Sequence, residues 1–167
     1  SHCSEPVYLV GEQVTPLSEM SSKGVRISLG TDGAASNDNS NLMHCIHSAY
    51  MLQALASRSM NFPVPEPKEF LNFATRGGAN CLGRTDIACL KEGMAADLFA
   101  LDTNKLDYVG AKHDPASLLP KMGVGEYVDL TMINGKFVWR NSELVGLDEK
   151  KLTFDAVAHL NRVVYEI

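Results

Sequence analysis

The stretch Val25-Arg26-Ile27-Ser28-Leu29-Gly30-Thr31-Asp32-Gly33 decides the fold class, because it is typical of a short strand that delivers a carboxylate at its C-terminal end. Apolar residues alternate over 25–29, and Gly-Thr-Asp-Gly has the composition of a turn. The preceding residues 16–22 predict a helix that leads into this strand. Helices and strands that alternate in this way indicate a parallel α/β layer.

A long amphipathic helix is predicted directly after the turn. Residues 36–40, Ser-Asn-Asp-Asn-Ser, are of the types that cap helices. A further helix is expected to begin at Pro67 and to run through Ala74, and a second helical turn is expected to end near Gly83. In the long helix, apolar residues recur at the spacing i, i+3, i+4, i+7 over about four turns: Leu42, Cys45, Ile46, Ala49, Leu52 and Ala56.

The second half of the chain is predicted to be rich in β-structure. Residues 95–102 are strand-like, and residues 129–139 predict a hairpin around Asn134-Gly135, a dipeptide that tight hairpin turns prefer. Asp148 is a candidate N-cap for a terminal helix. A boundary between the two halves is expected near residues 83–90. One face of the terminal helix would carry Leu152, Ala156, Leu160, Val163, Val164 and Ile167.

Composition and charge exclude several classes of protein. With 45% hydrophobic and 21% charged residues, the 167-residue chain is not disordered, collagenous or a coiled coil. A net charge of −5 without long runs of one sign argues against nucleic acid as a partner. No apolar segment reaches the roughly 18–20 residues that span a bilayer, so no membrane partner is expected. Four cysteines without a C-x-x-C pair indicate reduced thiols and a cytoplasmic protein: Cys3, Cys45, Cys81 and Cys89.

Asp32 is the main candidate for chemistry. A carboxylate between Gly30 and Gly33, at the end of a strand, occupies the rim position of catalytic groups in a parallel α/β barrel. It could ligate a metal or accept the proton of a metal-bound water. The alternative is that Asp32 only caps its turn, since Gly-Thr-Asp-Gly is a common turn composition.

The histidines are weaker candidates. His44 and His47 stand at i, i+3, within reach of one divalent ion, but both lie off the apolar stripe and no third ligand is in view. Solvent-facing histidines are therefore the favoured interpretation. His2, beside Cys3, is expected at the end of another strand, either positioning a substrate or packing. The sequence contains no Gly-rich phosphate loop, nucleophile elbow or His-Glu-x-x-His motif.

The first half contains too few strands to close a sheet. About one strand with flanking helices cannot make a closed or doubly covered sheet by itself. The start Ser1-His2-Cys3 has no Met and lies where a strand would already end. We therefore expect the chain to be an incomplete part of a longer protein.

The ordered motifs resemble the amidohydrolase superfamily, in its cytosine/guanine deaminase and chlorotriazine hydrolase branch. Residues 29–38, Leu-Gly-Thr-Asp-Gly-Ala-Ala-Ser-Asn-Asp, look like the last barrel strand and its loop, and His2-Cys3 looks like the rim motif of the preceding strand. Residues 74–83 are similar to the post-barrel helix of the family. Residues 90–98 and 133–136 look like the strand and the hairpin of its small β-sandwich.

The resemblance implies an α/β fold that is the C-terminal part of a metal-dependent hydrolase. Residues 1–83 would be the last strands and helices of a (β/α)8 TIM barrel. Residues 84–146 would belong to a composite β-sandwich, and residues 147–167 would form a C-terminal helix.

The resemblance also implies an aminohydrolase, or deaminase, with one divalent metal. Asp32 would be both metal ligand and catalytic residue, passing a proton from the metal-bound water to departing ammonia. His2, Ser36 and Asn37 would bind the substrate, a small heterocyclic molecule. Zinc is the expected metal and iron the alternative; either needs ligands that this chain lacks. Homo-oligomers are common in the family and are expected here.

The finer resemblance is to 8-oxoguanine deaminases, through Ser36-Asn37-Asp38 and residues 108–115. Two alternatives stay open: the same class of enzyme acting on a triazine, a pterin or an adenosine-type nucleoside, and a non-catalytic packing or interaction module. The chain departs from the family pattern at Cys45 and His47, where close relatives often carry an acidic residue and an arginine.

Overall fold

The computed structural model describes residues 1–37, 39–125 and 127–165, so Asp38 and Ile167 lie outside the described residues. The chain divides into two compact units. Unit 1 comprises Ser1–Ala95 and Asp102–Tyr127, and unit 2 comprises Ala96–Leu101 and Val128–Ile167. These units do not coincide with the segments 1–83, 84–146 and 147–167, whose assignment to a barrel, a sandwich and a terminal helix stays a prediction.

Two extended segments of unit 1 pair in parallel. The His2 N–H donates to Ser28 O at 2.7 Å, and the Gly30 N–H donates to His2 O at 3.0 Å. These bonds form one parallel bridge, between His2 and Leu29. The strand predicted over 25–29 is thus reduced to a single bridge, because its partner segment turns into a helix immediately after the pairing.

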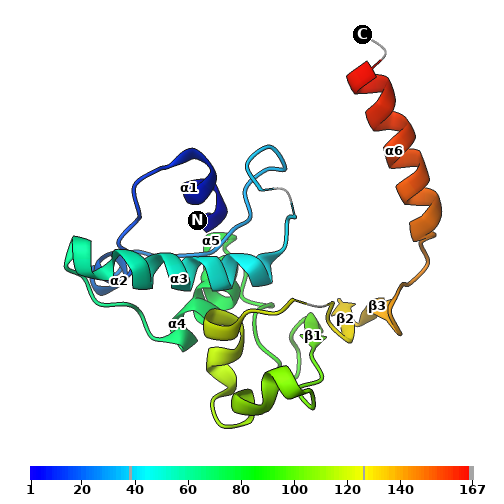
Figure 1. Cartoon of the computed structure of the whole chain (residues 1–167). Helices are drawn as coiled ribbons and strands as arrows, with labels where there is room; N and C mark the ends of the chain where they lie inside the picture. Colours follow the sequence, from blue (N-terminus) through cyan, green and yellow to red (C-terminus); the bar gives the residue numbers. More distant parts are fainter. Residues whose placement is uncertain (38, 126, 166–167) are drawn as a thin grey trace. The chain divides into compact units, whose positions relative to one another are not determined.

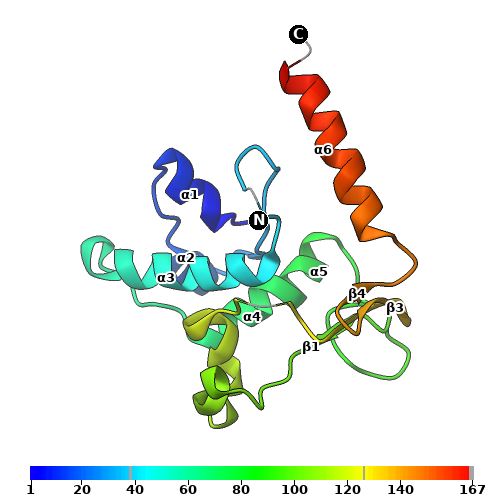
Figure 2. The ribbon, with the colours of Figure 1, turned by 45° about the vertical axis from the view of Figure 1, so that its right-hand side comes forward.

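Three helices lie in sequence around this pair (Figure 1): α1 (Ser4–Val10), α2 (Leu17–Ser22) and α3 (Leu42–Met60). The two predicted helices are confirmed, although α3 runs longer than expected and its N-cap is Asn41, whose side chain accepts from Met43 N at 3.0 Å. Figure 2 shows α1 beside α3, in agreement with their contacts. Leu42 is exposed, and the buried stripe of α3 consists of Cys45, Ile46, Ala49, Leu52, Gln53 and Ala56.

One polar residue in this stripe ties the chain before α2 to α3. Gln53 is 0% exposed. Its Nε2 donates to Thr15 O at 2.8 Å, and its Oε1 accepts from Leu17 N at 3.2 Å. Both ends of the buried amide are therefore satisfied by backbone groups that would otherwise lack partners in the core.

A second helical run carries the aromatic part of the core. Glu66 and Glu69 close its start with a capping box. Phe70 is 0% exposed, and its ring packs edge-to-face at 5.4 Å from Tyr50 and 5.9 Å from Phe73. The helix predicted from Pro67 is confirmed as three consecutive segments: α4 (Pro67–Asn72), the π-helical η1 (Phe73–Gly77) and α5 (Gly78–Cys81).

The π-helical segment lies against the extended segment 25–29. A Cβ atom on Gly77 would lie 2.0 Å from Ile27 O, so only a glycine allows this approach. At the next position, Gly78, an added Cβ would meet nothing within 4 Å. Gly77 therefore sets how closely the helical run covers the paired segments.

Three short helical turns between residues 106 and 122 belong to unit 1. The last turn packs on α3, where His47 Nδ1 lies 2.9 Å from Pro120 O. The bond fixes one edge of α3 to a segment more than sixty residues away. The turns are η2 (Leu106–Lys112), η3 (Pro115–Ser117) and η4 (Leu118–Met122).

Unit 2 contains a four-stranded antiparallel sheet with its strands in chain order. The predicted hairpin is confirmed, because Asn134 (φ 47°) and Gly135 (φ 77°) both have the positive φ that a type I′ turn requires. Asp97 Oδ1 accepts from Asn134 N at 2.7 Å and holds the turn. The strands are β1 (Leu98–Ala100), β2 (Leu130–Ile133), β3 (Lys136–Arg140) and β4 (Glu143–Leu144).

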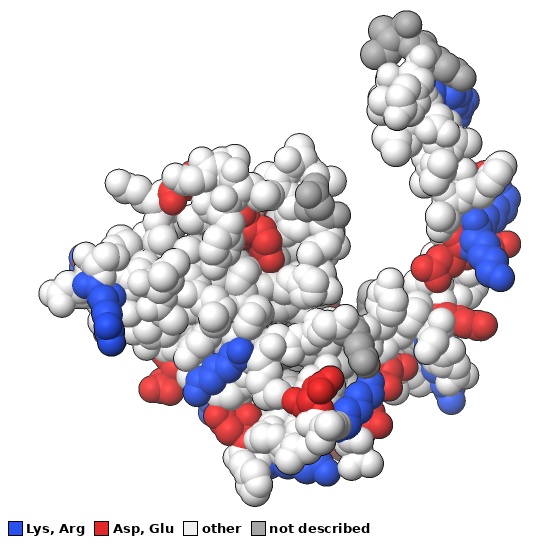
Figure 3. All heavy atoms as spheres, in the orientation of Figure 1, with Lys and Arg blue, Asp and Glu red and all other residues white. Residues whose placement is uncertain are grey.

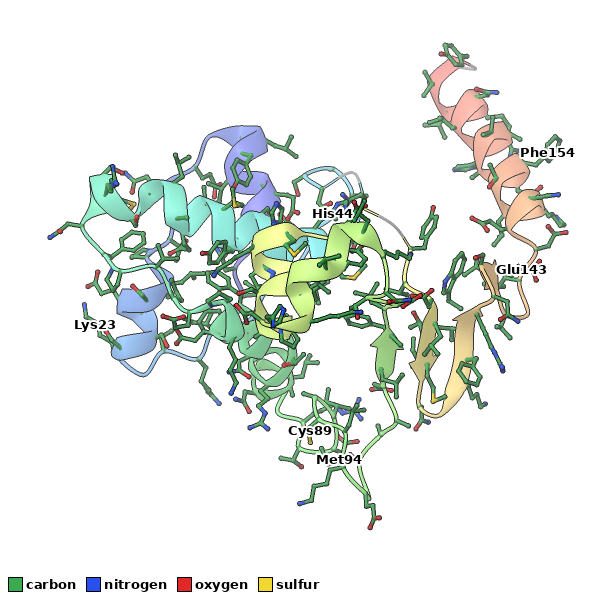
Figure 4. The ribbon with its side chains drawn as sticks, turned by 60° about the horizontal axis from the view of Figure 1, so that its bottom comes forward. Lys23, His44, Cys89, Met94, Glu143 and Phe154 are labelled. Carbon is green, nitrogen blue, oxygen red and sulfur yellow. The ribbon has the colours of Figure 1, made fainter. Side chains whose placement is uncertain are left out.

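The terminal helix α6 (Glu149–Tyr165) completes unit 2. Asp148 Oδ1 accepts from Lys151 N at 3.0 Å, which confirms the predicted N-cap. The described residues of α6 are all exposed, including the predicted apolar face. Figure 4 shows Phe154 projecting from this helix.

We predict that Gly77→Ala destabilises the protein by about 3 kcal/mol or more, because the new methyl group would overlap a backbone carbonyl that has little room to move. Urea denaturation measures the loss. Gly78→Ala is the matched control, because it replaces a helical glycine where the new methyl group points into open space. This substitution should be neutral or should stabilise the protein by about 0.4–1 kcal/mol. Equal effects of the two substitutions would contradict the close approach.

We predict that Gln53→Leu costs about 3 kcal/mol, although leucine is apolar, because the substitution leaves Leu17 N–H and Thr15 C=O without their buried partner. The same change at the exposed Gln13 should stay within about 0.5 kcal/mol. Thermal or urea unfolding of both variants tests this. A stable Gln53→Leu protein would show that water replaces the amide.

Candidate functional site

Asp32 lies in the loop that leaves the paired segments. Its backbone is left-handed, with φ 65°, a conformation that aspartate tolerates better than most residues. Its Oδ1 accepts from Gly33 N at 2.8 Å, and its Oδ2 accepts from Ser36 Oγ at 2.9 Å. The side chain is exposed, so the carboxylate is oriented by its own loop while its remaining lone pairs face outward.

The loop itself is a tight turn built on Gly33. The backbone N–H groups of Ser36 and Asn37 both donate to Gly33 O at 3.0 Å. The hydroxyl of Ser36 also lies 3.2 Å from Gly33 O, so it stands between the carbonyl and the Asp32 carboxylate. The carboxylate therefore caps its own turn and is still exposed. Its role in the chemistry stays a prediction.

Asn37 is 1% exposed and works inside the loop. Its Oδ1 accepts from the N–H groups of Asn39 and Ser40, each at 3.1 Å. Its Nδ2 lies 3.7 Å from Cys45 Sγ. The amide of Asn37 therefore stabilises the loop through hydrogen bonds within it. Contact of Asn37 with a substrate stays a prediction.

His2 is 8% exposed, and its Nε2 has no hydrogen-bond partner within the described part of the chain. Burial lowers the pKa of the imidazole below its ordinary value. The ring is therefore neutral at physiological pH. The Nε2 atom is itself buried, and a role of His2 in positioning a substrate stays a prediction.

His44 and His47 do not converge. His44 Nδ1 lies 2.7 Å from Asn39 Nδ2, whereas the Nδ1 of His47 contacts Pro120 O. The two imidazoles therefore contact different neighbours, Asn39 and Pro120. Among residues 1–37, 39–125 and 127–165, no three His, Cys, Asp or Glu side chains gather in a way that could hold a metal ion.

Of the residues present, Asp32 has the chemistry of a metal ligand. Asp32 offers exposed carboxylate oxygens at the end of the paired segments, and carboxylate oxygen is a ligand for zinc and for iron. A zinc site needs at least three protein ligands. Among the described residues no such set of ligands accompanies Asp32, whose role at a metal stays a prediction.

Other features of unit 1 lie apart from Asp32. A hollow beside α5 is lined by residues that include Arg76, Cys89 and Met94, the last two of which are labelled in Figure 4. Figure 3 shows basic side chains among acidic ones on the face that it draws. Arg84 pairs with Asp86 at 2.5 Å. In the described part of the chain, no helix is long and apolar enough to cross a membrane.

Sequence and structure comparisons identify relatives along nearly the whole chain. The chain is 52% identical over 165 residues to the hydroxydechloroatrazine ethylaminohydrolase of Pseudomonas sp. (strain ADP), covering 99% of the chain and 34% of the relative. It is 34% identical over 165 residues to a 5-methylthioadenosine/S-adenosylhomocysteine deaminase of Pelotomaculum thermopropionicum, covering 98% and 37%. The crystal structure of atrazine chlorohydrolase TrzN from Arthrobacter aurescens TC1, complexed with zinc, superposes with a TM-score of 0.86 at 32% identity, covering 94% and 34%.

The chain thus spans about a third of the length of each of these relatives. The model of the amidohydrolase family matches residues 1–138. That match covers most of the 167 residues, and the chain belongs to the amidohydrolase family.

Proposed function

We propose that this chain is part of a metal-dependent aminohydrolase that releases an amine from a nitrogen heterocycle. The observation that carries the proposal is Asp32, an exposed carboxylate held by Gly33 and Ser36 where the parallel segments end. In a (β/α)8 barrel, catalytic groups stand at the C-terminal ends of the strands. Residues 1–83 would contribute the last strands and helices of such a barrel, and residues 84–146 would contribute to a β-sandwich.

A triazine is the substrate class best supported. The relative that shares 52% of its aligned residues is named for removing an ethylamino group from hydroxydechloroatrazine. An adenosine-type nucleoside is the second candidate, since a relative at 34% identity is named as a deaminase of such compounds. The expected resemblance to 8-oxoguanine deaminases finds no support in these relatives.

Asp32 would be one ligand of a bound zinc ion. Zinc is preferred over iron because the similar crystal structure is complexed with zinc. The remaining ligands would come from the part of the relatives' length that this chain does not span. When bound, the ion would act as a Lewis acid that makes water nucleophilic at neutral pH.

The residues of this chain would then handle the proton. Asp32 would accept a proton as water attacks the ring carbon, and would pass it to the departing amine, so that water is consumed and amine released in equal amounts. Ser36 and Gly33 donate to opposite oxygens of the carboxylate and so fix its plane during this transfer. Ser36 would also contact the substrate, and the Nε2 of His2, which has no partner within the described residues, would bind a ring nitrogen. Asn37 would act through the shape of the loop.

We predict that Asp32→Asn in the whole protein lowers kcat by about 10²–10⁴-fold, because the amide neither accepts the proton nor offers an anionic ligand. Asparagine suits the test since it tolerates the left-handed backbone at φ 65°. Release of ethylamine from hydroxydechloroatrazine and of ammonia from adenosine would be followed for the zinc-loaded protein. The zinc content per chain should also fall.

Asp107→Asn is the matched control, because Asp107 is an exposed carboxylate on η2. It should leave turnover and zinc content unchanged. Wild-type turnover in Asp32→Asn would contradict the role of Asp32. Turnover of neither substrate by the unmodified protein would contradict the proposed substrate classes.

A further inference from the structure

A polar cluster lies beneath the loop that carries Asp32. It joins side chains from three places that are distant in sequence: α1, the Asp32 loop and the first turns of α3. Its members are buried or partly buried, so their hydrogen bonds are shielded from water and constrain one another. The cluster consists of Ser4, Glu5, Asn37, Cys45 and Ser48.

On one side, the cluster holds α1 to α3. Ser4 Oγ lies 3.1 Å from Cys45 O and 2.6 Å from Ser48 Oγ. Tyr8 Oη donates to Ser48 O at 2.9 Å one turn further along α1. Since α1 begins two residues after His2, these bonds also fix the direction in which the chain leaves the paired segments.

On the other side, the cluster holds the Asp32 loop. Asn37 Nδ2 lies 3.7 Å from Cys45 Sγ, which is within the range of a hydrogen bond to sulfur. This contact leaves Asn37 Oδ1 free to accept from Asn39 and Ser40 and so to close the loop. The thiol is 0% exposed.

The thiol of Cys45 stays protonated. Burial and, after it, the influence of the nearby Glu5 together raise the pKa of Cys45 to about 12. The neutral thiol contacts the amide of Asn37, while the carbonyl of the same residue accepts from Ser4 on α1. Cys45 therefore contacts both the Asp32 loop and α1.

We propose that Cys45 is a positioning residue that couples α1 to the Asp32 loop, through the hydrogen bond that its carbonyl accepts from Ser4 and the contact of its thiol with Asn37. The inference deepens the proposed function, because the loop it holds carries the carboxylate assigned to metal and proton. Cys45 itself does not touch the reacting atoms. It acts by keeping Asn37, and thereby the turn from Asp32 onward, in one conformation.

The first test follows the amides that Asn37 closes. In the whole protein, Cys45→Ala should speed hydrogen exchange of the Asn39 and Ser40 amides about tenfold or more, as measured by NMR. Asn37→Ala should do the same. In the Asn37→Ala background, Cys45→Ala should add nothing, because the two side chains act through one contact. Exchange that speeds up additively, or not at all, would overturn the proposal.

The second test separates positioning from packing. Cys45→Ser keeps a small group that donates and accepts, so it should restore slow exchange, whereas a purely apolar packing role would not be rescued by serine. On the substrate that the whole protein turns over, kcat should fall about 10- to 100-fold in Cys45→Ala and recover in Cys45→Ser. Equal losses in the two variants would contradict positioning.

Cys81→Ala is the control for loss of a thiol, since Cys81 is exposed on α5. It should change neither exchange nor kcat. The exchange experiment does not depend on activity, so it tests the coupling even where the proposed reaction fails. Conversely, an active protein with unchanged exchange would retain the proposed function and lose this inference.

Discussion

Two backbone hydrogen bonds between His2 and residues 28 and 30 set the geometry on which the rest of unit 1 depends. They hold two segments parallel, so that both segments leave the pair at the same edge. The first segment continues into α1 and the second continues into the Asp32 loop, and α1 and this loop are therefore neighbours. The long helix α3 then packs beside both, and the helical run with Gly77 closes against the backbone of Ile27. A parallel pair has no local turn to define it, so it is fixed by what packs on it.

The elements that the sequence predicted well are those specified by neighbouring residues. The spacing of apolar residues predicted α3, Asn134-Gly135 predicted the hairpin, and Asp148 predicted the start of α6. Each depends on periodicity, turn chemistry or capping within a few residues. Asp32 as the focus of the loop was also within reach, because the glycines around it and the preceding alternation are local signals.

The features that the sequence did not predict depend on contacts between distant residues. Gln53 reads as a polar residue inside an apolar stripe, and nothing nearby shows that it binds the backbone before α2. Asn37 reads as a substrate-facing residue of a motif, yet its side chain is buried against Cys45. The packing of η4 on α3 likewise depends on a surface formed by residues distant in sequence. A weak signal existed in Gln53, since a polar group on a buried face needs a partner.

The departures at Cys45 and His47 are best understood together. In the pattern that the chain resembles, these positions often carry an acid and an arginine, a pair of opposite charges. A carboxylate at position 45 would stand buried beside Glu5 and would need a cation to offset it. Here position 45 carries a buried thiol, and His47 Nδ1 lies 2.9 Å from Pro120 O. Asp32 accepts its own hydrogen bonds from Gly33 and Ser36. The side chains that support the loop are therefore different from those that orient the carboxylate that the loop presents.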